Sequence, residues 1–454
     1  MQRRYNEKSF GMEKNAMSEK IQIPRRVCAA VLNSLSAGVV PRTGQEYIAI
    51  GRTREIAALL SDLETVETGG SAFRMITGRY GSGKSFLLQL LRSHALERGF
   101  AVADCDLTPE RRLAGAKGQG LATYRELARN LSCRAAPDGG ALPVILSRWI
   151  ASVQLMCAKR DGLSPNDPAL SVATETAVSE AIADLSGYVH GFDFSAVIGA
   201  FYRGTRTGDE ELKNNALRWL RGEFPTKTEA RRVLPVSSII TDETWYDVLK
   251  LLAALMVKTG QKGLLIIIDE AVNLYKIVQT VAREANYEKL LGIFNDATQG
   301  RLSNMAFFFG GTPQLVEDTR RGLYSYEALR SRLRVNRYAE GTQDFAGPIL
   351  MLTPLTPEEL LALLKRIVIL HAQRYEWTPP VTDEQLAGFV ADIAGRMGAD
   401  VLLTPREVVR DFTGLLNILQ QNPGNTFKDL AGDLEIKPAD KREVVEEEFA
   451  EFTL

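Results

Sequence analysis

Cysteine and histidine are scarce in this sequence, and neither is clustered. The four cysteines form no C-x-x-C pair, and the three histidines lie far apart. Zinc sites and redox pairs need ligands at close spacing, so we expect neither kind of site. We expect buried, reduced thiols in a cytoplasmic protein at Cys28, Cys105, Cys133 and Cys157.

Long hydrophobic runs are also missing. Two apolar stretches, Leu264–Ile268 and Ala306–Gly311, are far shorter than the ~20 residues that span a bilayer. The N-terminus is polar and mixed in charge, so we expect neither a secretory signal nor a membrane contact. Residues 1–17 are interpreted as an extension, with Met12 and Met17 as alternative starts.

An excess of charge of either sign is absent. Lys and Arg number 55 and Asp and Glu 56, which gives a net charge of −1. A net basic field therefore cannot drive nucleic-acid binding, although a local basic patch could bind DNA. With 45% apolar and 24% charged residues, the chain has the composition of a globular protein. Its 454 residues correspond to about three domains, or to one large domain with insertions.

Strand and helix patterns alternate in two separated parts of the chain. This alternation predicts an α/β fold with a parallel sheet. Between the second and third strands, residues 109–241 show only helical spacing and predict a long helical insertion, with a mobile loop near Gly204–Asp209. The five expected strands are Phe73–Thr77, Phe100–Leu107, Leu264–Ile268, Met305–Phe309 and Ile349–Leu352.

These patterns divide the chain into four expected regions. Residues 1–44 form an N-terminal extension with a short helix, and residues 45–352 form the α/β core with its insertion. Residues 353–421 form a helical lid that begins at the helix N-cap Thr356. Residues 422–454 form an acidic tail, since residues 426–454 contain nine acidic and four basic side chains.

The strongest motif is GRYGSGKS, from Gly78 to Ser85, which fits the P-loop pattern G-x-x-x-x-G-K-[ST] in full. Its glycines let the backbone curl around phosphates, and its amides form an anion nest at a helix N-terminus. Lys84 is predicted to bind the β- and γ-phosphates of ATP, and the Ser85 hydroxyl to bind Mg²⁺. The predicted nucleotide-binding residues of this segment are Gly78, Arg79, Tyr80, Gly81, Ser82, Gly83, Lys84, Ser85 and Phe86.

The second motif is the apolar run Leu264–Ile268 followed by Asp269 and Glu270. A continuous apolar run predicts a strand buried on both faces, and ligands bind beyond the carboxyl ends of such strands. Asp269 is therefore predicted to bind Mg²⁺ through water, and Glu270 to orient and polarise the attacking water. The alternative is a buried strand that ends in a solvated acidic turn. No helicase motif set accompanies these residues.

Three further side chains are candidates for catalysis. Thr312 follows the strand Met305–Phe309, where a polar residue of additional-strand NTPases touches the γ-phosphate; the alternative is a simple Gly-Pro turn. Arg332, within a set that includes Arg330 and Arg334, is predicted to act on the ATP of a neighbouring subunit. Arg406, held by Thr404 and Pro405 at a helix start, is predicted to reach the phosphates. For both arginines, ordinary surface charge is the alternative.

Together these motifs resemble AAA+ ATPases of the origin-recognition and helicase-loader type. Ile50-Gly51-Arg52 resembles the adenine-side box of that group, and Thr404-Pro405-Arg406 is similar to its sensor-two arginine. The resemblance covers about residues 45–108 and 243–421. It implies a P-loop NTPase of the AAA+ type, with a parallel five-stranded sheet, a C-terminal helical lid, and Gly51 and Arg52 beside the nucleotide.

A closer resemblance covers most of the chain. The strings SLSAGVVPRTG, FRMITGRYGSGKSF, DLTPERRL, IDEAVNLYK and YEALRSRL resemble the ATP-binding proteins of BREX phage-defence systems, of the BrxD type. This resemblance implies a bacterial cytoplasmic protein that acts with other defence components, which in that family include a large superfamily-two helicase.

Three functions remain open at this level. The first is an ATPase that forms a homo-oligomer with ATP at subunit interfaces and loads or regulates a partner, such as a helicase, on DNA. The second is a slow-turnover ATP-dependent switch or scaffold. The third is a DNA-binding regulator, although no zinc finger, homeodomain or basic zipper is present and the basic clusters are only pairs.

Overall fold

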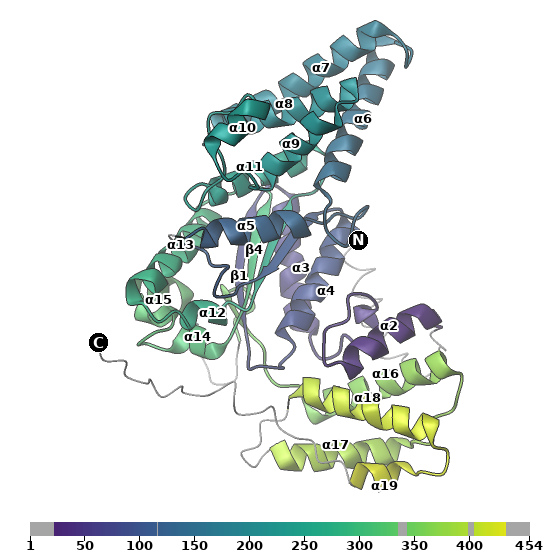
Figure 1. Ribbon diagram of the computed structural model, residues 1–454. Coiled ribbons are helices and arrows are strands. Elements are labelled where there is room, and N and C mark those ends of the chain that lie inside the picture. Colours follow the sequence, from purple (N-terminus) through teal and green to yellow (C-terminus); the bar gives the residue numbers. More distant parts are fainter. Residues whose placement is uncertain (1–21, 116, 335–342, 398–403, 433–454) are drawn as a thin grey trace. The chain divides into compact units, whose positions relative to one another are not determined.

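The computed structural model describes residues 22–115, 117–334, 343–397 and 404–432 (Figure 1). The chain divides into two compact units. The larger unit contains residues 52–353, and the smaller one combines residues 1–51 with residues 354–454.

The larger unit is built on a five-stranded parallel sheet, as predicted. Its order is β2-β3-β4-β1-β5, so that β4 is an additional strand between β1 and β3 (Figure 1). Because all strands run in one direction, their carboxyl ends share one edge, where parallel sheets bind ligands. The strands are β1 (Ser71–Thr77), β2 (Ala101–Asp106), β3 (Leu264–Asp269), β4 (Met305–Gly311) and β5 (Ile349–Met351).

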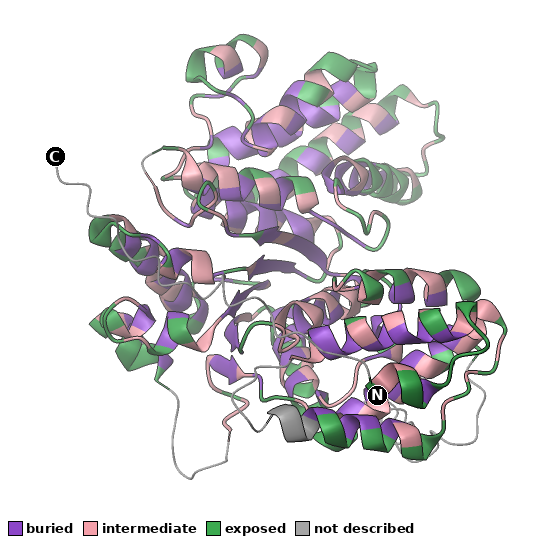
Figure 2. Cartoon of the chain, turned by 60° about the horizontal axis from the view of Figure 1, so that its bottom comes forward, coloured by how far each residue is buried: buried purple, intermediate pink, exposed green. Residues whose placement is uncertain are grey.

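Strands β3 and β4 are apolar on both faces and buried at every position except Asp269 at the end of β3, and Figure 2 shows the sheet largely buried. Ile267 and Phe308 pack on one face in a cluster with side chains of α3 (Thr53–Glu67) and α4 (Lys84–Arg98). Ile266 and Phe307 pack on the other face with α11 (Trp245–Lys258) and α13 (Thr280–Thr298). A strand covered on both sides must be apolar at every position, which explains the continuous runs in the sequence. Three short helices complete this part: α12 (Val272–Tyr275), α14 (Pro313–Glu317) and α15 (Glu327–Leu333).

Six helices lie between β2 and α11, in the segment predicted as a helical insertion (Figure 1). Their side chains belong to the same apolar cluster as one face of the sheet. At residues 204–207 the predicted mobile loop is wrong, because α8 continues to Thr207. A Cβ on Gly204 would lie 2.8 Å from the Asp209 carbonyl oxygen, so this glycine permits close chain approach. The helices are α5 (Gln119–Asn130), α6 (Leu142–Asp161), α7 (Pro168–Ala183), α8 (Gly191–Thr207), α9 (Glu210–Leu220) and α10 (Lys227–Val233).

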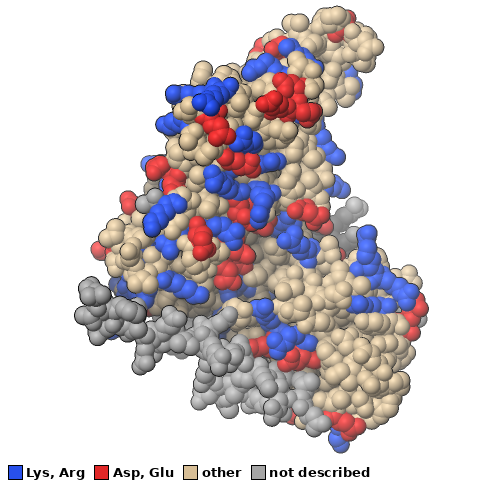
Figure 3. Space-filling model, in the orientation of Figure 1, with Lys and Arg blue, Asp and Glu red and all other residues tan. Residues whose placement is uncertain are grey.

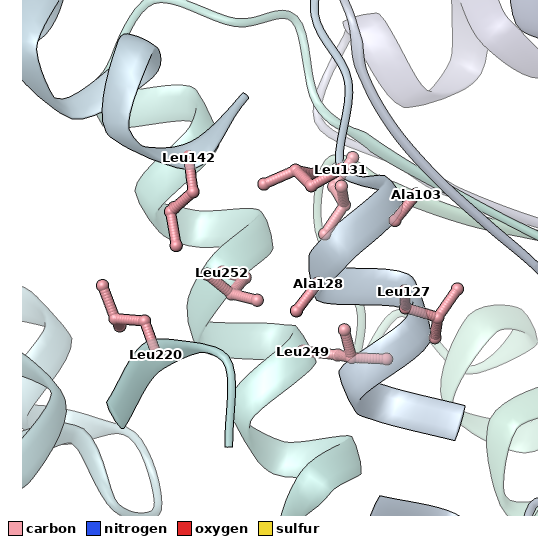
Figure 4. Close-up of a pocket in the computed structure, with 9 residues that line it drawn as sticks. Ala103, Leu127, Ala128, Leu131, Leu142, Leu220, Leu249 and Leu252 are labelled. Carbon is pink, nitrogen blue, oxygen red and sulfur yellow. The ribbon is translucent and has the colours of Figure 1, made fainter. Parts of the chain in front are cut away.

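A small apolar cavity lies where the insertion meets the sheet (Figure 4). Leucine and alanine side chains alone line it, from α5, α6, α9, α11, β2 and β3. Its volume is about 10 Å³, which is close to the minimum for a single water molecule, and an apolar void of this kind stays dry. The cavity is therefore a packing defect and not a ligand site.

The smaller unit is helical. Helix α2 (Arg25–Ser36) packs against α16 (Pro357–Tyr375) and α18 (Pro405–Gln421), so the N-terminal helix shares a core with the C-terminal helices. Thr356 is the N-cap of α16 and forms a capping box with Glu359, as its sequence position predicts. Phe427, within the predicted tail, is buried against Phe389 and Phe412. The remaining helices are α17 (Asp383–Met397) and α19 (Phe427–Gly432).

His371 of α16 makes the stability of the smaller unit depend on pH. The fully buried ring accepts a hydrogen bond at Nδ1 from Trp377 Nε1 (3.0 Å), so Nε2 carries the proton and donates to Asn417 Oδ1 (3.1 Å). Burial, assisted by the nearby Arg374, lowers the pKa of His371 below its ordinary value of 6.5. As the pH falls below that value, the unfolded chain binds a proton that the folded unit resists, so folding stability decreases.

We therefore expect the melting temperature of the smaller unit to fall from about pH 7.5 to about pH 5.5. His371→Asn removes this proton uptake, so the variant should be less stable at neutral pH but less sensitive to acid. Thermal melts at several pH values measure both effects. Equal pH slopes in the two proteins would contradict the assignment.

Candidate nucleotide-binding site

The loop from Gly78 to Gly83 joins β1 to α4 and is tightly curled. Gly81 and Gly83 have φ angles of +72° and +92°, which side chains with a Cβ rarely adopt. No atom lies within 4 Å of a Cβ built on Gly83, so backbone conformation alone requires glycine there. A Cβ on Gly78 would instead overlap the Ser82 hydroxyl. The loop thus ends at the N-terminus of a 15-residue helix, where backbone N–H groups attract anions.

Lys84, the first residue of α4, directs its ammonium group back into this loop. Its Nζ donates hydrogen bonds to the carbonyl oxygens of Gly78 and Arg79, at 2.9 Å each. Desolvation lowers the pKa of Lys84, while the charges of Asp269 and Glu270 oppose that effect. The positive charge of Lys84 is therefore stabilised by the Asp269 and Glu270 carboxylates as well as by the carbonyl oxygens of the loop.

The two predicted metal ligands are in direct contact. Ser85 Oγ donates a hydrogen bond to Asp269 Oδ2 at 2.5 Å. The second oxygen of the same carboxylate, Oδ1, accepts a hydrogen bond from the backbone N–H of Glu270 at 2.8 Å. The start of α4 and the turn after β3 are thus both hydrogen-bonded to the Asp269 carboxylate.

Glu270 follows this carboxylate in an unusual backbone conformation. Its φ angle is +55°, in the left-handed region that few residues other than glycine adopt. Asn273 stabilises the turn, because its Nδ2 donates to the carbonyl oxygens of Leu107 (2.8 Å) and Glu270 (3.3 Å). Partial desolvation, followed by the charges of Asp269 and Asp106, raises the pKa of Glu270. A carboxylate with a raised pKa is a stronger base toward water.

Two residues near this edge were not identified from the sequence. Asp106 ends β2 and pairs in register with Asp269, and desolvation together with the Asp269 charge raises its pKa. Gly310 of β4 lies directly against the Asp269 carboxylate. The rule that ligands bind beyond the carboxyl ends of parallel strands could have indicated Asp106. A glycine inside a strand often marks a close approach, which could have indicated Gly310.

Arg52 lies beneath the loop, buried to 6% exposure. Its guanidinium donates to the carbonyl oxygens of Ser82 (3.2 Å) and Thr353 (2.8 Å) and to the carboxylate of Glu55 (3.2 Å). These contacts of the buried guanidinium stabilise the loop on the side that faces the protein interior. Thr312 has a structural contact too, since its hydroxyl accepts from the Leu315 N–H (3.2 Å) and caps α14.

The other predicted residues lie farther along the chain. Arg332 is exposed and donates to Asn295 Oδ1 and to the Ala328 carbonyl oxygen, both at 2.9 Å. Gly51 and Arg406 belong to the smaller unit. A Cβ on Gly51, whose φ is +75°, would lie 2.7 Å from a carboxylate oxygen of Glu359. Arg406 lies in the first turn of α18, beside Gly38. Their roles toward a nucleotide stay predictions.

The residues at the loop are chemically suited to a nucleoside triphosphate and Mg²⁺. The buried hydroxyls of Thr77 and Ser82 have no hydrogen-bond partner among the described residues, as expected where a ligand supplies one. Backbone N–H groups and Lys84 suit phosphate, and Ser85 and Asp269 suit a hard cation. Within the described residues, no group of three or more His, Cys, Asp or Glu side chains could hold a metal by itself.

A parallel sheet with this loop and this acidic strand end is that of a P-loop NTPase. The chain belongs to the family of BREX system ATP-binding proteins BrxC/D, which its residues 23–435 match. Membership assigns the chain to nucleotide binding within a phage-defence system and implies that other components of that system are its partners. A search of the curated proteins found no match. In the described part of the chain, no helix has the length and apolar character to cross a membrane.

Proposed function

We propose that this protein is a Mg²⁺-dependent ATPase of the AAA+ type in a bacterial BREX system. We further propose that it acts in the cytoplasm and uses ATP-driven assembly to load or regulate a partner, such as a helicase, on DNA. The observation that supports hydrolysis is the convergence of Lys84, Ser85, Asp269 and Glu270 at one edge of the sheet. A binding site without turnover would need no residue in the position of Glu270.

Each of these side chains has one role in the proposed reaction. Backbone N–H groups of residues 78–85 and the Lys84 ammonium bind the phosphates and stabilise the charge that develops on them. Ser85 and Asp269 would hold Mg²⁺, which would supply Lewis-acid chemistry to the phosphates. Glu270 orients the attacking water and accepts its proton, for which its raised pKa is suited.

The proposed core is residues 45–352 and the proposed lid is residues 353–421, whereas the compact units of the structure divide after Gly51 and after Thr353. We propose that Arg406 of the lid acts on the phosphates. The proposed contact of the insertion with DNA is supported by a small basic patch on α10, where Lys227, Arg231 and Arg232 are exposed. In Figure 3, basic side chains gather over α10 at the upper left, beside acidic ones. A patch this small suits an auxiliary contact better than a main binding surface.

A slow-turnover switch or scaffold is the second candidate. The Thr312 hydroxyl caps α14 and the Arg332 guanidinium is bonded within its own chain. Both groups would have to change partners to contact a γ-phosphate. If they do not, the site has Lys84 and Glu270 but lacks additional stabilisation of the transition state, and hydrolysis is slow.

One experiment separates these candidates. ATP binding and phosphate release are measured for the purified protein with Mg²⁺ and with EDTA, over a wide range of protein concentrations. Size-exclusion chromatography with light scattering then follows assembly with ATP and Mg²⁺, with DNA and the system's helicase added in turn. Turnover that rises with assembly supports the motor. Tight binding with slow, concentration-independent turnover supports the switch, and absence of ATP binding rejects both.

The proposed trans-acting arginine is tested by complementation. Arg330, Arg332 and Arg334 are all exposed, and Leu329 and Leu333 anchor α15 in the core. The side chains of Arg330 and Arg334 make no hydrogen bond or ion pair with the described residues, whereas the Arg332 guanidinium must first leave Asn295. We expect Arg332→Ala to bind ATP normally but to hydrolyse it about 10³-fold more slowly.

Mixing Arg332→Ala with Lys84→Ala should partly restore turnover, because each variant retains the half-site that the other lacks. Arg330→Ala and Arg334→Ala are measured in parallel and identify the acting residue if Arg332→Ala has no effect. Failure of all three mixtures to recover activity excludes these three arginines.

A further inference from the structure

Gly310 is in contact with the acidic turn that follows β3. It lies in β4, with Ile76 of β1 as its register partner on one side. On the other side its carbonyl oxygen accepts a hydrogen bond from the Ala271 N–H at 2.9 Å. The residue after Glu270 is thus bound to the backbone of Gly310, which fixes the distance between the acidic turn and β4.

A side chain at this position would collide with Asp269. A Cβ built on Gly310 overlaps Asp269 Oδ1 and lies 2.9 Å from Asp269 Cγ. Leu88 Cδ1 lies 3.0 Å from the same point, so a methyl group could not move toward α4 without a further collision. The φ angle of Gly310 is not positive, so its backbone conformation would accept alanine. Space for the carboxylate is therefore the reason for glycine here.

The carboxylate that occupies this space has two partners. Oδ1 accepts from the N–H of Glu270, which helps to maintain the left-handed conformation of that residue, and Oδ2 accepts from Ser85 Oγ. If the carboxylate is displaced, both hydrogen bonds are lost together. The orientation of the proposed metal ligands and of the proposed general base therefore depends on the absence of a side chain at Gly310.

We propose that Gly310 is a positioning residue of the nucleotide site, whose lack of a side chain holds the Asp269 carboxylate between Ser85 and Glu270. This inference rests on the proposed function, in which Ser85 and Asp269 hold Mg²⁺. Gly310 itself contacts neither nucleotide nor metal. It acts through Asp269 alone, and this makes the inference testable.

The test variant is Gly310→Ala. Because the severe overlap is with the Asp269 side chain at the sheet edge and no backbone atom is among the close contacts, we expect its melting temperature to remain close to that of the unsubstituted protein. Binding of a fluorescent ATP analogue in EDTA should be retained, since the loop and Lys84 are untouched. The gain in affinity on adding Mg²⁺ should fall by about 10–100-fold, as for other residues that orient metal ligands.

The control is Gly311→Ala, one residue along the same strand. A Cβ there would meet Leu315 Cδ2 at 2.9 Å and Met75 Sδ at 3.3 Å, which are the mobile ends of apolar side chains and no carboxylate. This variant should keep the Mg²⁺ dependence. An equal loss in both variants would mean that any methyl in this strand disturbs the site, and it would overturn the inference.

A double-mutant cycle with Asp269→Ala gives the decisive result. If Gly310 acts only through the carboxylate, adding Gly310→Ala to Asp269→Ala causes no further loss of Mg²⁺-dependent binding. Additive losses would overturn the inference. Should Gly310→Ala fail to fold, the double variant should fold as well as Asp269→Ala, because the colliding group is gone; an unfolded double variant would overturn it.

A nucleotide-free measurement separates this inference from the proposed function. Amide hydrogen exchange of the segment around Glu270 reports its hydrogen bond to Asp269 without any ligand. Gly310→Ala should lose this protection and Gly311→Ala should keep it, even if the protein binds no ATP. Retained protection in Gly310→Ala rejects the positioning role and leaves the proposed ATPase function unaffected.

Discussion

Lys84→Ala is expected to abolish tight ATP binding. The Lys84 ammonium is hydrogen-bonded to the loop through the Gly78 and Arg79 carbonyl oxygens, so its removal takes a positive charge out of the phosphate site. Charge-assisted hydrogen bonds to phosphate are about twice as strong as neutral ones. We expect a loss of at least about 100-fold in affinity, since a charged interaction of ~3 kcal/mol corresponds to that factor.

The measurement is a titration with a fluorescent ATP analogue, followed by thermal melts with and without ATP. The unsubstituted protein should gain stability with ATP, because a ligand of the folded state raises the melting temperature, and Lys84→Ala should not. Lys258→Ala is the control, because it removes the same charge away from the loop, where Lys258 pairs with Asp184 of the insertion. Unchanged ATP affinity in Lys84→Ala would refute the assignment of the loop as the phosphate site.

Glu270→Gln is expected to separate binding from turnover. The amide has the size of the carboxylate and its backbone keeps the hydrogen bond to Asp269, so the left-handed turn should persist. Glutamine cannot accept the proton of the attacking water, and loss of a general base typically reduces the rate by about 10²–10⁴-fold. ATP affinity should remain within about threefold, because Lys84, Ser85 and Asp269 are unchanged.

Single-turnover phosphate release and equilibrium ATP binding measure the two quantities separately. Glu284→Gln, an exposed glutamate on α13, is the matched control and should hydrolyse ATP at the unsubstituted rate. The trapped ATP-bound form of Glu270→Gln is also the best species in which to observe assembly and partner binding. Steady-state hydrolysis at the normal rate in Glu270→Gln would remove Glu270 from the mechanism.

Asp106 shows why local patterns identify only part of a site. The apolar run before Asp269 is long and continuous, so its end is easy to recognise, whereas β2 carries the polar Asp104 and Asp106 beside Cys105. Only the in-register pairing of β2 with β3 brings Asp106 next to Asp269. The same holds for Gly310, whose neighbour Asp269 is 41 positions away in the chain and meets it only across paired strands.

The sequence by itself determined the phosphate-binding loop, the acidic end of a buried strand, the parallel five-stranded sheet and the capped start of α16. The loop, the acidic strand end and the helix cap each depend on residues within one short segment, where glycine conformations, apolar periodicity and capping act locally. The parallel sheet follows from the alternation of strand and helix patterns along the chain. The tertiary structure alone decided the contacts of Ser85 with Asp269, the space at Gly310, the crossing at Gly204 and the packing of α2 on α16 and α18. These features join segments distant in the chain, because side chains find such partners only when strands pair and helices pack to fill a common core.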